Sequence, residues 1–430
     1  MRTPAHVVAA CITRRRRRLS SIVCAVAIAV ATLEAQQLPT SSPESQGLAP
    51  GRLERLHAFL TEEIDAKRYS GAVLLVARNG RVVDWSSFGL RDREAGLAME
   101  KDTIVRIYSM SKIVTTVAAM LLVEDGRIRL NDPVEKYLPA LAKMRVWTSG
   151  PEKKPVLVPA KTPITIKHLL THTSGFIYGF GKEPIDKRYQ KADPYASPSM
   201  DAFVAAMARL PLAFQPGEKF SYGFGIDLAG AVIEKVTGQS LDRFVAAKIT
   251  EPLGMVDTGY SVPEVKRARL AKIYSRDKSG ALKEAEVVAS VNVDGTGFAR
   301  GGAGMFSTVG DFARFGQMLL NGGELDGTRV LARKSVELMM ANQLATLAQP
   351  TTDPGGGYGF GYGGGVRVNL AGEGVPGSLG QFGWSGAATT YFNIDPKENT
   401  MVLLFMQHFP YNEDDVFARF SAIFYSALVK

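Results

Sequence analysis

The residues with the clearest chemical potential are Ser109 and Lys112, which stand three positions apart in the sequence Ser-Met-Ser-Lys. The apolar stretch that follows predicts a helix starting here, and residues three apart share one helix face, so the Lys112 ammonium can reach the Ser109 hydroxyl. A serine becomes a strong nucleophile when a neighbouring base takes its proton. Ile113 and Val114 follow directly, which argues against a solvated helix face. The pair predicts nucleophilic attack on an ester or amide carbonyl, against the alternative of a capping serine beside a surface lysine.

Regular patterns on both sides of this pair predict the elements that position it. Apolar residues recur at helical spacing over residues 53–64, which predicts an amphipathic helix. Two β-rich runs then flank Asn79-Gly80, a strong hairpin signal. The apolar, alanine-rich stretch 113–123 predicts the helix that the serine and the lysine open.

The rest of the chain divides into a helical middle and a β-rich end. Residues 131–290 carry helical patterns interrupted by proline and glycine, and β-rich runs return after about residue 355, followed by a closing helix over residues 414–428. The expected fold is α+β, an antiparallel sheet assembled from both ends of the chain and flanked by helices. We expect a sheet lobe of about residues 49–130 and 291–430, with a helical lobe of about residues 131–290 inserted into it.

The N-terminal 35 residues have the order of a bacterial signal peptide. Five arginines, Arg14 to Arg18, precede an uncharged apolar stretch that is too short to span a bilayer, and small residues follow it. We therefore expect an exported protein, periplasmic or secreted. A linker over residues 36–48 and a catalytic domain over residues 49–430 would follow the signal peptide, with no membrane span in the mature chain. A membrane-anchoring N-terminal helix is the alternative.

Removal of residues 1–35 changes both the charge and the cysteine content. They hold six of the 51 Lys and Arg residues and one of the 42 Asp and Glu residues, so the formal net charge falls from +9 to +4. Nucleic-acid binding thereby loses its main support. Cys11 and Cys24 both lie in this segment, so the mature chain can form neither disulfides nor thiolate metal sites. A lipid anchor on Cys24 is a weaker alternative, because Val23 rather than a small residue precedes it.

Six ordered motifs link the pair to a known family. They are residues 108–112 (YSMSK), 169–175 (LLTHTSG), 216–222 (PGEKFSY), 251–255 (EPLGM), 301–308 (GGAGMFST) and 382–386 (FGWSG). Together they resemble the serine β-lactamase-like hydrolases, in the branch close to class C β-lactamases and family VIII carboxylesterases. The resemblance runs from about residue 45 to the C-terminus. It implies a β-lactamase-like, penicillin-binding-protein-like fold, a small-molecule ester or amide substrate, and no metal or organic cofactor.

The resemblance also implies a role for each matching position. Tyr222 is expected beside the nucleophile Ser109, where it and Lys112 would move protons as a coupled pair. The backbone N–H groups of Ser109 and Ala387 would form the oxyanion hole, with Gly386 allowing close approach of the backbone. The implied substrate-binding positions are Trp384, Ser385, Gly386 and Phe224.

Two positions depart from the β-lactamase pattern. Phe224 stands where Y-x-N has asparagine, and Trp384 stands where K-T-G has lysine. Both changes remove polar groups that bind a β-lactam and add aromatic surface, which favours a carboxylic ester over a substrate bearing a carboxylate. A β-lactamase or D-alanyl peptidase remains the first alternative, and a catalytically silent binding or assembly protein of the same fold is the second. Oligomeric state stays open.

Three further signals are weaker. Residues 359–364 fit G-x-G-x-x-G, but a strand rather than a helix is expected to follow, which argues against nucleotide binding. His168 and His172 stand four apart, yet no nearby carboxylate would complete a metal site. His408 is the remaining candidate for a Ser-His-Asp triad.

Overall fold

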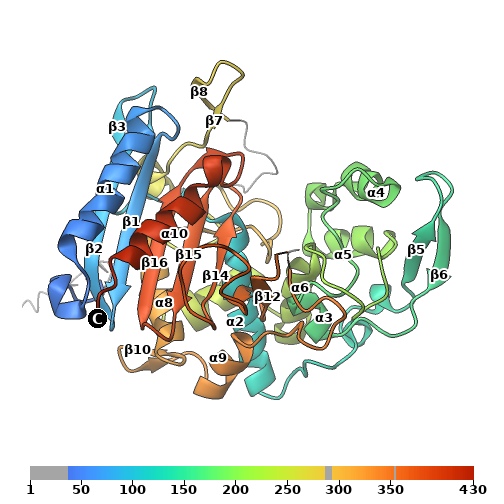
Figure 1. The fold of residues 1–430 in the computed structure, drawn as a ribbon. Coiled ribbons are helices and arrows are strands. Elements are labelled where there is room, and N and C mark those ends of the chain that lie inside the picture. The colour runs from blue at the N-terminus through green and yellow to red at the C-terminus, as the bar shows by residue number, and fades with distance from the viewer. Residues whose placement is uncertain (1–36, 286–292, 353–354) are drawn as a thin grey trace, which may run out of the picture. The chain divides into compact units, whose positions relative to one another are not determined.

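A computed structural model describes residues 37–285, 293–352 and 355–430. The predicted signal peptide lies outside the described residues. The described part contains an eight-stranded antiparallel sheet with the strand order β12-β13-β14-β15-β16-β1-β2-β3. Helices cover both faces of this sheet, and a mainly helical region lies beyond its β12 edge (Figure 1). This is the α+β architecture expected from the sequence.

The sheet is built from both ends of the chain, as predicted. Its strands are β1 (Gly71–Arg78), β2 (Arg81–Asp92), β3 (Leu97–Ala98), β12 (Tyr358–Phe360), β13 (Gly365–Arg367), β14 (Phe382–Gly386), β15 (Thr390–Asp395) and β16 (Thr400–Met406). β1 pairs with β16 on one side and with β2 on the other, so the N-terminal hairpin and the C-terminal strands form one continuous sheet.

The predicted hairpin at Asn79-Gly80 is present. Both turn residues have positive φ, 52° at Asn79 and 74° at Gly80, as a two-residue turn between twisted strands requires. The strand that leads into the turn is buried on both faces, with Leu75 in the core on one side and Leu74 in the core on the other. The centre of the sheet therefore excludes water completely and forms a rigid platform.

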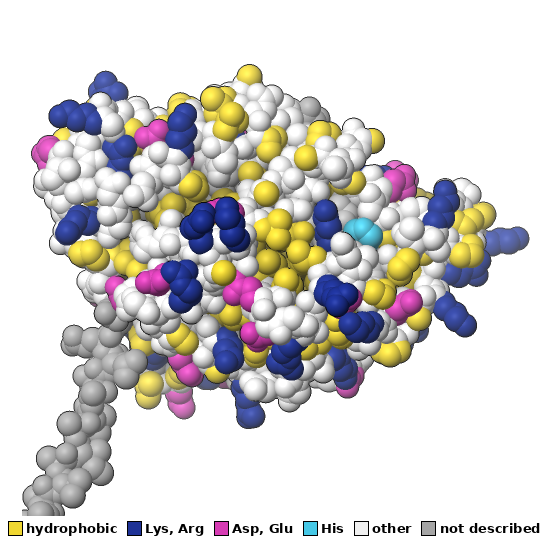
Figure 2. Space-filling view, turned by 90° about the horizontal axis from the view of Figure 1, so that it is seen from below, with side chains coloured by type: hydrophobic (Ala, Val, Ile, Leu, Met, Phe, Trp, Pro, Cys, Tyr) yellow, Lys and Arg dark blue, Asp and Glu magenta, His cyan; other side chains and the backbone are white. Residues whose placement is uncertain are grey.

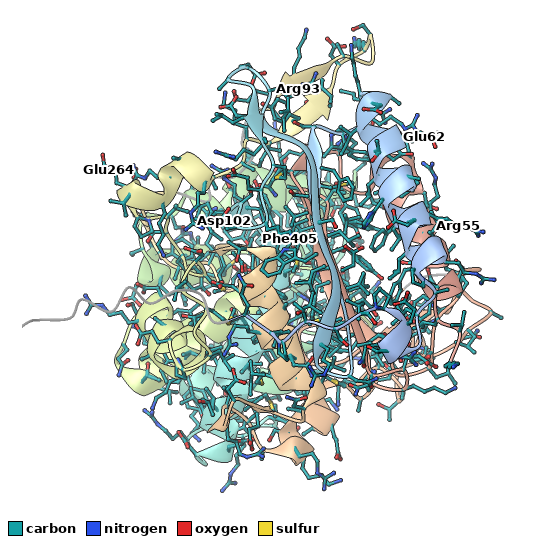
Figure 3. All side chains as sticks on the ribbon, turned by 90° about the vertical axis from the view of Figure 1, so that its left-hand side faces the viewer. Arg55, Glu62, Arg93, Asp102, Glu264 and Phe405 are labelled. Atoms are coloured by element: carbon teal, nitrogen blue, oxygen red, sulfur yellow. The ribbon has the colours of Figure 1, made fainter. Side chains whose placement is uncertain are left out.

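One face of the sheet is covered by α1 (Pro50–Asp65) and α10 (Val416–Ser426), which pack against each other and against the sheet. Arg55 and Glu62 project from the outer side of α1, whereas Phe405 of β16 lies deep inside the molecule (Figure 3). The opposite face is covered by α8 (Val309–Leu320) and by α2 (Ser111–Glu124), which contains Lys112 and directly follows the turn that carries Ser109.

The helical region packs against α2 mainly through α6. Its elements are α3 (Ile166–Leu170), α4 (Pro184–Ala192), α5 (Met200–Ala208), α6 (Gly225–Thr237), α7 (Leu241–Val245), and the hairpin of β5 (Arg145–Ser149) and β6 (Val156–Pro159). The sequence analysis did not foresee this hairpin, because its strands are short and half-exposed.

The expected end of the helical lobe at about residue 290 lies outside the described residues. Before it, β7 (Tyr274–Arg276) lies between β17 (His408–Phe409) and β8 (Leu282–Glu284) in a separate three-stranded sheet. The sequence analysis did not foresee this strand, because three residues are too few to show an alternating pattern. The remaining elements are β4 (Val105–Arg106), β9 (Phe306–Ser307), β10 (Glu324–Leu325), β11 (Thr328–Arg329) and α9 (Arg333–Met339), with short 3-10 and π turns.

Two surface properties bear on partners. Within the described ranges, no helix combines the length and the apolar character needed to cross a bilayer. On the face seen from below, lysine and arginine side chains are spread among acidic ones rather than gathered into a stripe (Figure 2).

A buried carboxyl group lies at the start of α8. The Thr308 hydroxyl caps the helix by accepting from the Asp311 N–H. The Asp311 carboxylate accepts from the Asp257 N–H at 2.6 Å and from the Thr258 hydroxyl at 2.9 Å. Its other oxygen is buried without a partner among the described residues, and burial raises the pKa of Asp311 to about 6. The folded protein therefore binds a proton at Asp311 more tightly than an unfolded chain does.

This shift predicts a pH-dependent effect of Asp311→Asn. The stabilisation from a raised carboxyl pKa is fully present below the ordinary value of 3.8 and is lost as the pH rises through about 6. We expect the variant to gain stability relative to the parent between pH 4 and pH 8, by up to about 3 kcal/mol. Urea unfolding at both pH values measures this, with the exposed Asp125→Asn as control. An Asp311→Asn difference that does not change with pH contradicts the assignment.

Candidate active site

Ser109 stands on a strained turn. A 3-10 turn, Tyr108–Met110, runs directly into α2, and Tyr108 has a φ of 42°, in the left-handed region that non-glycine residues rarely adopt. The Tyr108 ring is buried and packs edge-to-face on Phe409. The Ser111 hydroxyl donates to the Tyr108 carbonyl at 2.6 Å and accepts from the Met305 N–H at 3.1 Å. These contacts fix the turn and leave Ser109 half-exposed at its tip.

Lys112 is completely buried directly beneath Ser109. Its ammonium donates to the Ser109 hydroxyl at 3.2 Å and to the Gly302 carbonyl at 2.6 Å. It also faces the ring of Tyr222 at 4.6 Å and the ring of Tyr178 at 5.2 Å. A buried ammonium needs such partners, because an uncompensated charge in an apolar interior is very costly. The structure thus brings together the serine, the lysine and the tyrosine that the sequence singled out.

Tyr222 reaches the site from the turn before α6. Its hydroxyl accepts a hydrogen bond from the Trp384 indole N–H at 3.0 Å, and its ring lies 4.7 Å from the ring of His172. His172 Nδ1 accepts from the Gly223 N–H at 3.3 Å, so this histidine holds the backbone next to Tyr222. Burial, reinforced by the Lys112 charge, lowers the pKa of His172 well below its ordinary range. His172 is therefore a neutral packing partner of Tyr222.

The end of β14 lies against the turn that carries Ser109. β13 pairs only with the first two residues of β14, so the strand from Trp384 onward is free to face the turn. A Cβ on Gly386 would come within 2.4 Å of the Ile107 carbonyl oxygen, so only glycine fits there. The Ser385 hydroxyl contacts the Tyr411 hydroxyl at 2.6 Å. Ala387 follows directly, next to the turn.

Asp227 is a site residue whose importance the sequence analysis missed. It lies in the first turn of α6, is fully buried, and accepts hydrogen bonds from the Gly302 N–H at 2.9 Å and from the Tyr195 and Tyr178 hydroxyls at 3.1 and 3.3 Å. Burial raises the pKa of Asp227, while the charge of Lys112 acts in the opposite direction. A carboxylate inside the apolar stretch 225–233 was the signal that could have identified it.

Gly302 connects Asp227 to Lys112. Its N–H donates to the carboxylate, and its carbonyl accepts from the ammonium. A Cβ at this position would meet an Asp227 oxygen at 2.4 Å and the Tyr178 hydroxyl at 2.9 Å, so a larger residue cannot be accommodated. The buried carboxylate therefore both anchors the segment that orients Lys112 and balances its charge.

Phe224 is not where the sequence analysis placed it. The side chain is buried, and its ring packs on Tyr178 at 4.6 Å, Tyr195 at 5.0 Å and Phe203 at 5.9 Å. The prediction that Phe224 shapes the substrate wall is therefore wrong. Directly preceding α6, the residue faces the core of the helical region and supports the two tyrosines from behind.

The remaining histidine hypotheses can also be compared with the structure. His408 Nε2 contacts Glu413 at 2.6 Å and its ring packs on Tyr69, so no contact with Ser109 is found among the described residues. His168 closes a capping box with Thr165 at the start of α3. Within the described ranges, no group of three or more metal-ligating side chains occurs. The G-x-G-x-x-G stretch forms the β12–β13 hairpin.

A serine on a strained turn, with a lysine one helical turn further on and the unpaired end of a sheet strand beside it, is the arrangement expected of a serine hydrolase with the β-lactamase fold. Sequence comparison agrees, and the chain belongs to the Beta-lactamase family, whose profile matches residues 56–425.

Three relatives define the chain's position within the family more closely. Esterase EstB of Burkholderia gladioli is 31% identical over 81% of this chain and 89% of its own. Lovastatin esterase of Penicillium rubens is 34% identical over 78% of this chain and 88% of its own. The solved structure of EstCE1, described as a hydrolase with promiscuous acyltransferase activity, has a TM-score of 0.76 at 26% identity and covers 89% of this chain and 99% of its own. The chain is thus a serine hydrolase whose relatives include esterases acting on small molecules.

The geometry around Asp227 predicts that its charge matters for turnover. Asp227→Asn keeps an oxygen for the Gly302 N–H but removes the negative charge beside Lys112 and turns an amide N–H₂ toward two tyrosine hydroxyls. We expect kcat on p-nitrophenyl butyrate to fall by about tenfold or more. The exposed Asp201→Asn on α5 is the matched control. Parent-like kcat and melting temperature in Asp227→Asn would show that the charge is dispensable.

Proposed function

We propose that the protein is an exported carboxylesterase in which Ser109 attacks the ester carbonyl and forms an acyl-enzyme. The observation that carries this proposal is the 3.2 Å contact between Lys112 Nζ and Ser109 Oγ, made by a lysine with no access to solvent. Groups that pass on a proton in catalysis lie at about this heavy-atom distance from the group they serve. Because an ammonium has no free electron pair, Lys112 would take the Ser109 proton only as one of its own protons moves to the Tyr222 oxygen, which starts as a phenolate. The export step rests on the signal-peptide pattern of residues 1–35.

Proton transfer is assigned to Lys112 and Tyr222 acting together. Lys112 contacts the nucleophile directly, and Tyr222 lies over the same ammonium. The Trp384 N–H that points at the Tyr222 oxygen would stabilise a phenolate, because a donor stabilises an acceptor more strongly when the acceptor is charged. The proton taken from Ser109 would then be delivered to the leaving alcohol through Tyr222.

Stabilisation of the negative charge that develops on the carbonyl oxygen is assigned to the backbone N–H groups of Ser109 and Ala387. The close approach of Gly386 to Ile107 supports this assignment, because it holds the end of β14 against the nucleophile turn. Backbone donors fixed in this way need no reorganisation when the tetrahedral intermediate forms.

An ester is favoured over a β-lactam or a peptide by the surroundings of Trp384. The indole takes the place of the lysine that would hold a substrate carboxylate, and its N–H is already committed to Tyr222. The Tyr222 ring lies 5.5 Å from the indole, and the fully buried Phe360 ring supports the indole from behind at 5.1 Å, so the two partly exposed rings of Trp384 and Tyr222 give this side of the site its aromatic character. Acyl transfer to an alcohol is a second candidate, supported by the likeness to EstCE1 and by these apolar walls, which disfavour water.

The mechanism predicts that Tyr222→Phe loses rate rather than binding. The ring and its packing remain, but the oxygen that moves the proton is gone, so kcat on p-nitrophenyl butyrate should fall by about a hundredfold with KM changed by a small factor. Ser109→Ala and Lys112→Ala should be inactive. Tyr189→Phe, which removes a buried phenol elsewhere in the helical region, is the control. If Tyr222→Phe keeps kcat within about threefold while Lys112→Ala is inactive, Lys112 acts as the base alone.

A further inference from the structure

A groove of about 280 Å³ opens beside the cleft, on the face of β14 and β15 that carries α10. It begins at Trp384 and Ser385, which we place at the substrate, and ends at the first turn of α10. The side chains that characterise it are Tyr358, Tyr391, Tyr411, Phe417, Glu373 and Asp415. The proposed proton transfer and the proposed oxyanion hole give this groove no role.

Tyr411 forms the lip between the cleft and the groove. Its hydroxyl contacts the Ser385 hydroxyl at 2.6 Å, and its ring lies 5.7 Å from the ring of Phe417 inside the groove. Burial raises the pKa of Tyr411, and Tyr222 contributes in the same direction, which places the Tyr411 phenol within electrostatic range of the proposed proton carrier. The groove therefore adjoins β14 at Ser385, one of the expected substrate-binding positions.

The groove combines aromatic faces with negative charge. Tyr391 and Phe417 pack with their rings 4.9 Å apart, and the residues that line the groove include carboxylates but no lysine, arginine or histidine. Asp415 is exposed at the start of α10, where the Asn412 amide donates to it at 3.3 Å. Among the described residues, no basic side chain forms an ion pair with Asp415. Aromatic faces and a carboxylate together attract a cation and repel an anion.

We infer that this groove binds a cationic group of the substrate, of the quaternary ammonium type, distal to the scissile ester bond. The inference rests on the proposed esterase function and adds a substrate class to it. Tyr411, Phe417 and Asp415 are then specificity-determining residues. Position 384 has a matching effect on substrate charge. This chain has tryptophan there, where the β-lactamase pattern has a lysine that would attract an anionic substrate.

Matched substrates that differ only in charge test the inference. Butyrylcholine and 3,3-dimethylbutyl butyrate carry the charge, or its carbon isostere, on the alcohol side. The p-nitrophenyl esters of 4-(trimethylammonio)butyrate and of 5,5-dimethylhexanoate do so on the acyl side. We expect kcat/KM to favour the ammonium member of at least one pair by about fivefold or more, and the pair that shows it identifies which side of the substrate enters the groove.

Variants distinguish an effect of the groove residues on the ammonium preference from the effect of any change in surface charge. Asp415→Asn should reduce the ammonium preference by about threefold or more, and Tyr411→Leu should reduce it similarly by removing the ring face. Asp414→Asn changes the same charge one residue away, in a side chain that pairs with Arg276 and does not line the groove, and should keep the preference. A ratio near one for both pairs in the parent overturns the inference. An equal loss of the ammonium preference in Asp414→Asn and Asp415→Asn also overturns it.

A binding measurement keeps this test independent of catalysis. Calorimetry on Ser109→Ala protein should show butyrylcholine binding more tightly than 3,3-dimethylbutyl butyrate if the alcohol side enters the groove. Failure of the parent to hydrolyse p-nitrophenyl butyrate would overturn the proposed function. Hydrolysis of that ester without any ammonium preference, in rate or in binding, would overturn only the assignment of the groove.

Discussion

The burial of the Lys112 ammonium is the constraint on which the rest of the site depends. A charge without solvent must be balanced within a few ångströms, and the fold supplies a serine hydroxyl, a glycine carbonyl, two aromatic faces and a nearby carboxylate. Each comes from a different part of the chain. The same partners that make the buried lysine tolerable also hold its ammonium 3.2 Å from the Ser109 hydroxyl, so one arrangement stabilises the charge and places it beside the proposed nucleophile.

The sheet contributes rigidity and a backbone surface. Its centre is buried on both faces, which fixes β14, and the unpaired end of that strand presses against the strained turn at Tyr108. Close contact there is possible only because Gly386 lacks a side chain. Trp384 then joins the sheet to the helical region through its hydrogen bond to Tyr222. The sheet and the helical region, which share one hydrophobic core, are thereby also joined by a hydrogen bond at the place where the chemistry is proposed.

Local patterns were enough to predict the first helix, the Asn79-Gly80 hairpin and the contact between Ser109 and Lys112, because spacing within one element determines each of them. The role of Asp227 could not be predicted in this way, since its partner Gly302 lies 75 residues further along the chain. The prediction for Phe224 was wrong for a related reason. The family pattern aligns the position in sequence, but only packing decides whether its side chain faces the substrate or the core. Strands as short as β7 contain too few residues to show an alternating pattern.

In the proposed mechanism, Ser109 Oγ carries the acyl group, and Lys112 is required for the acyl-enzyme to form. Intact-mass spectrometry during turnover of a slowly hydrolysed p-nitrophenyl ester, followed by peptide mapping, tests this most directly. The predicted result is a mass increase equal to the acyl group, located on the peptide that contains Ser109 and absent in the Ser109→Ala and Lys112→Ala proteins. An adduct on another residue, or one that forms equally well without Lys112, would contradict the account.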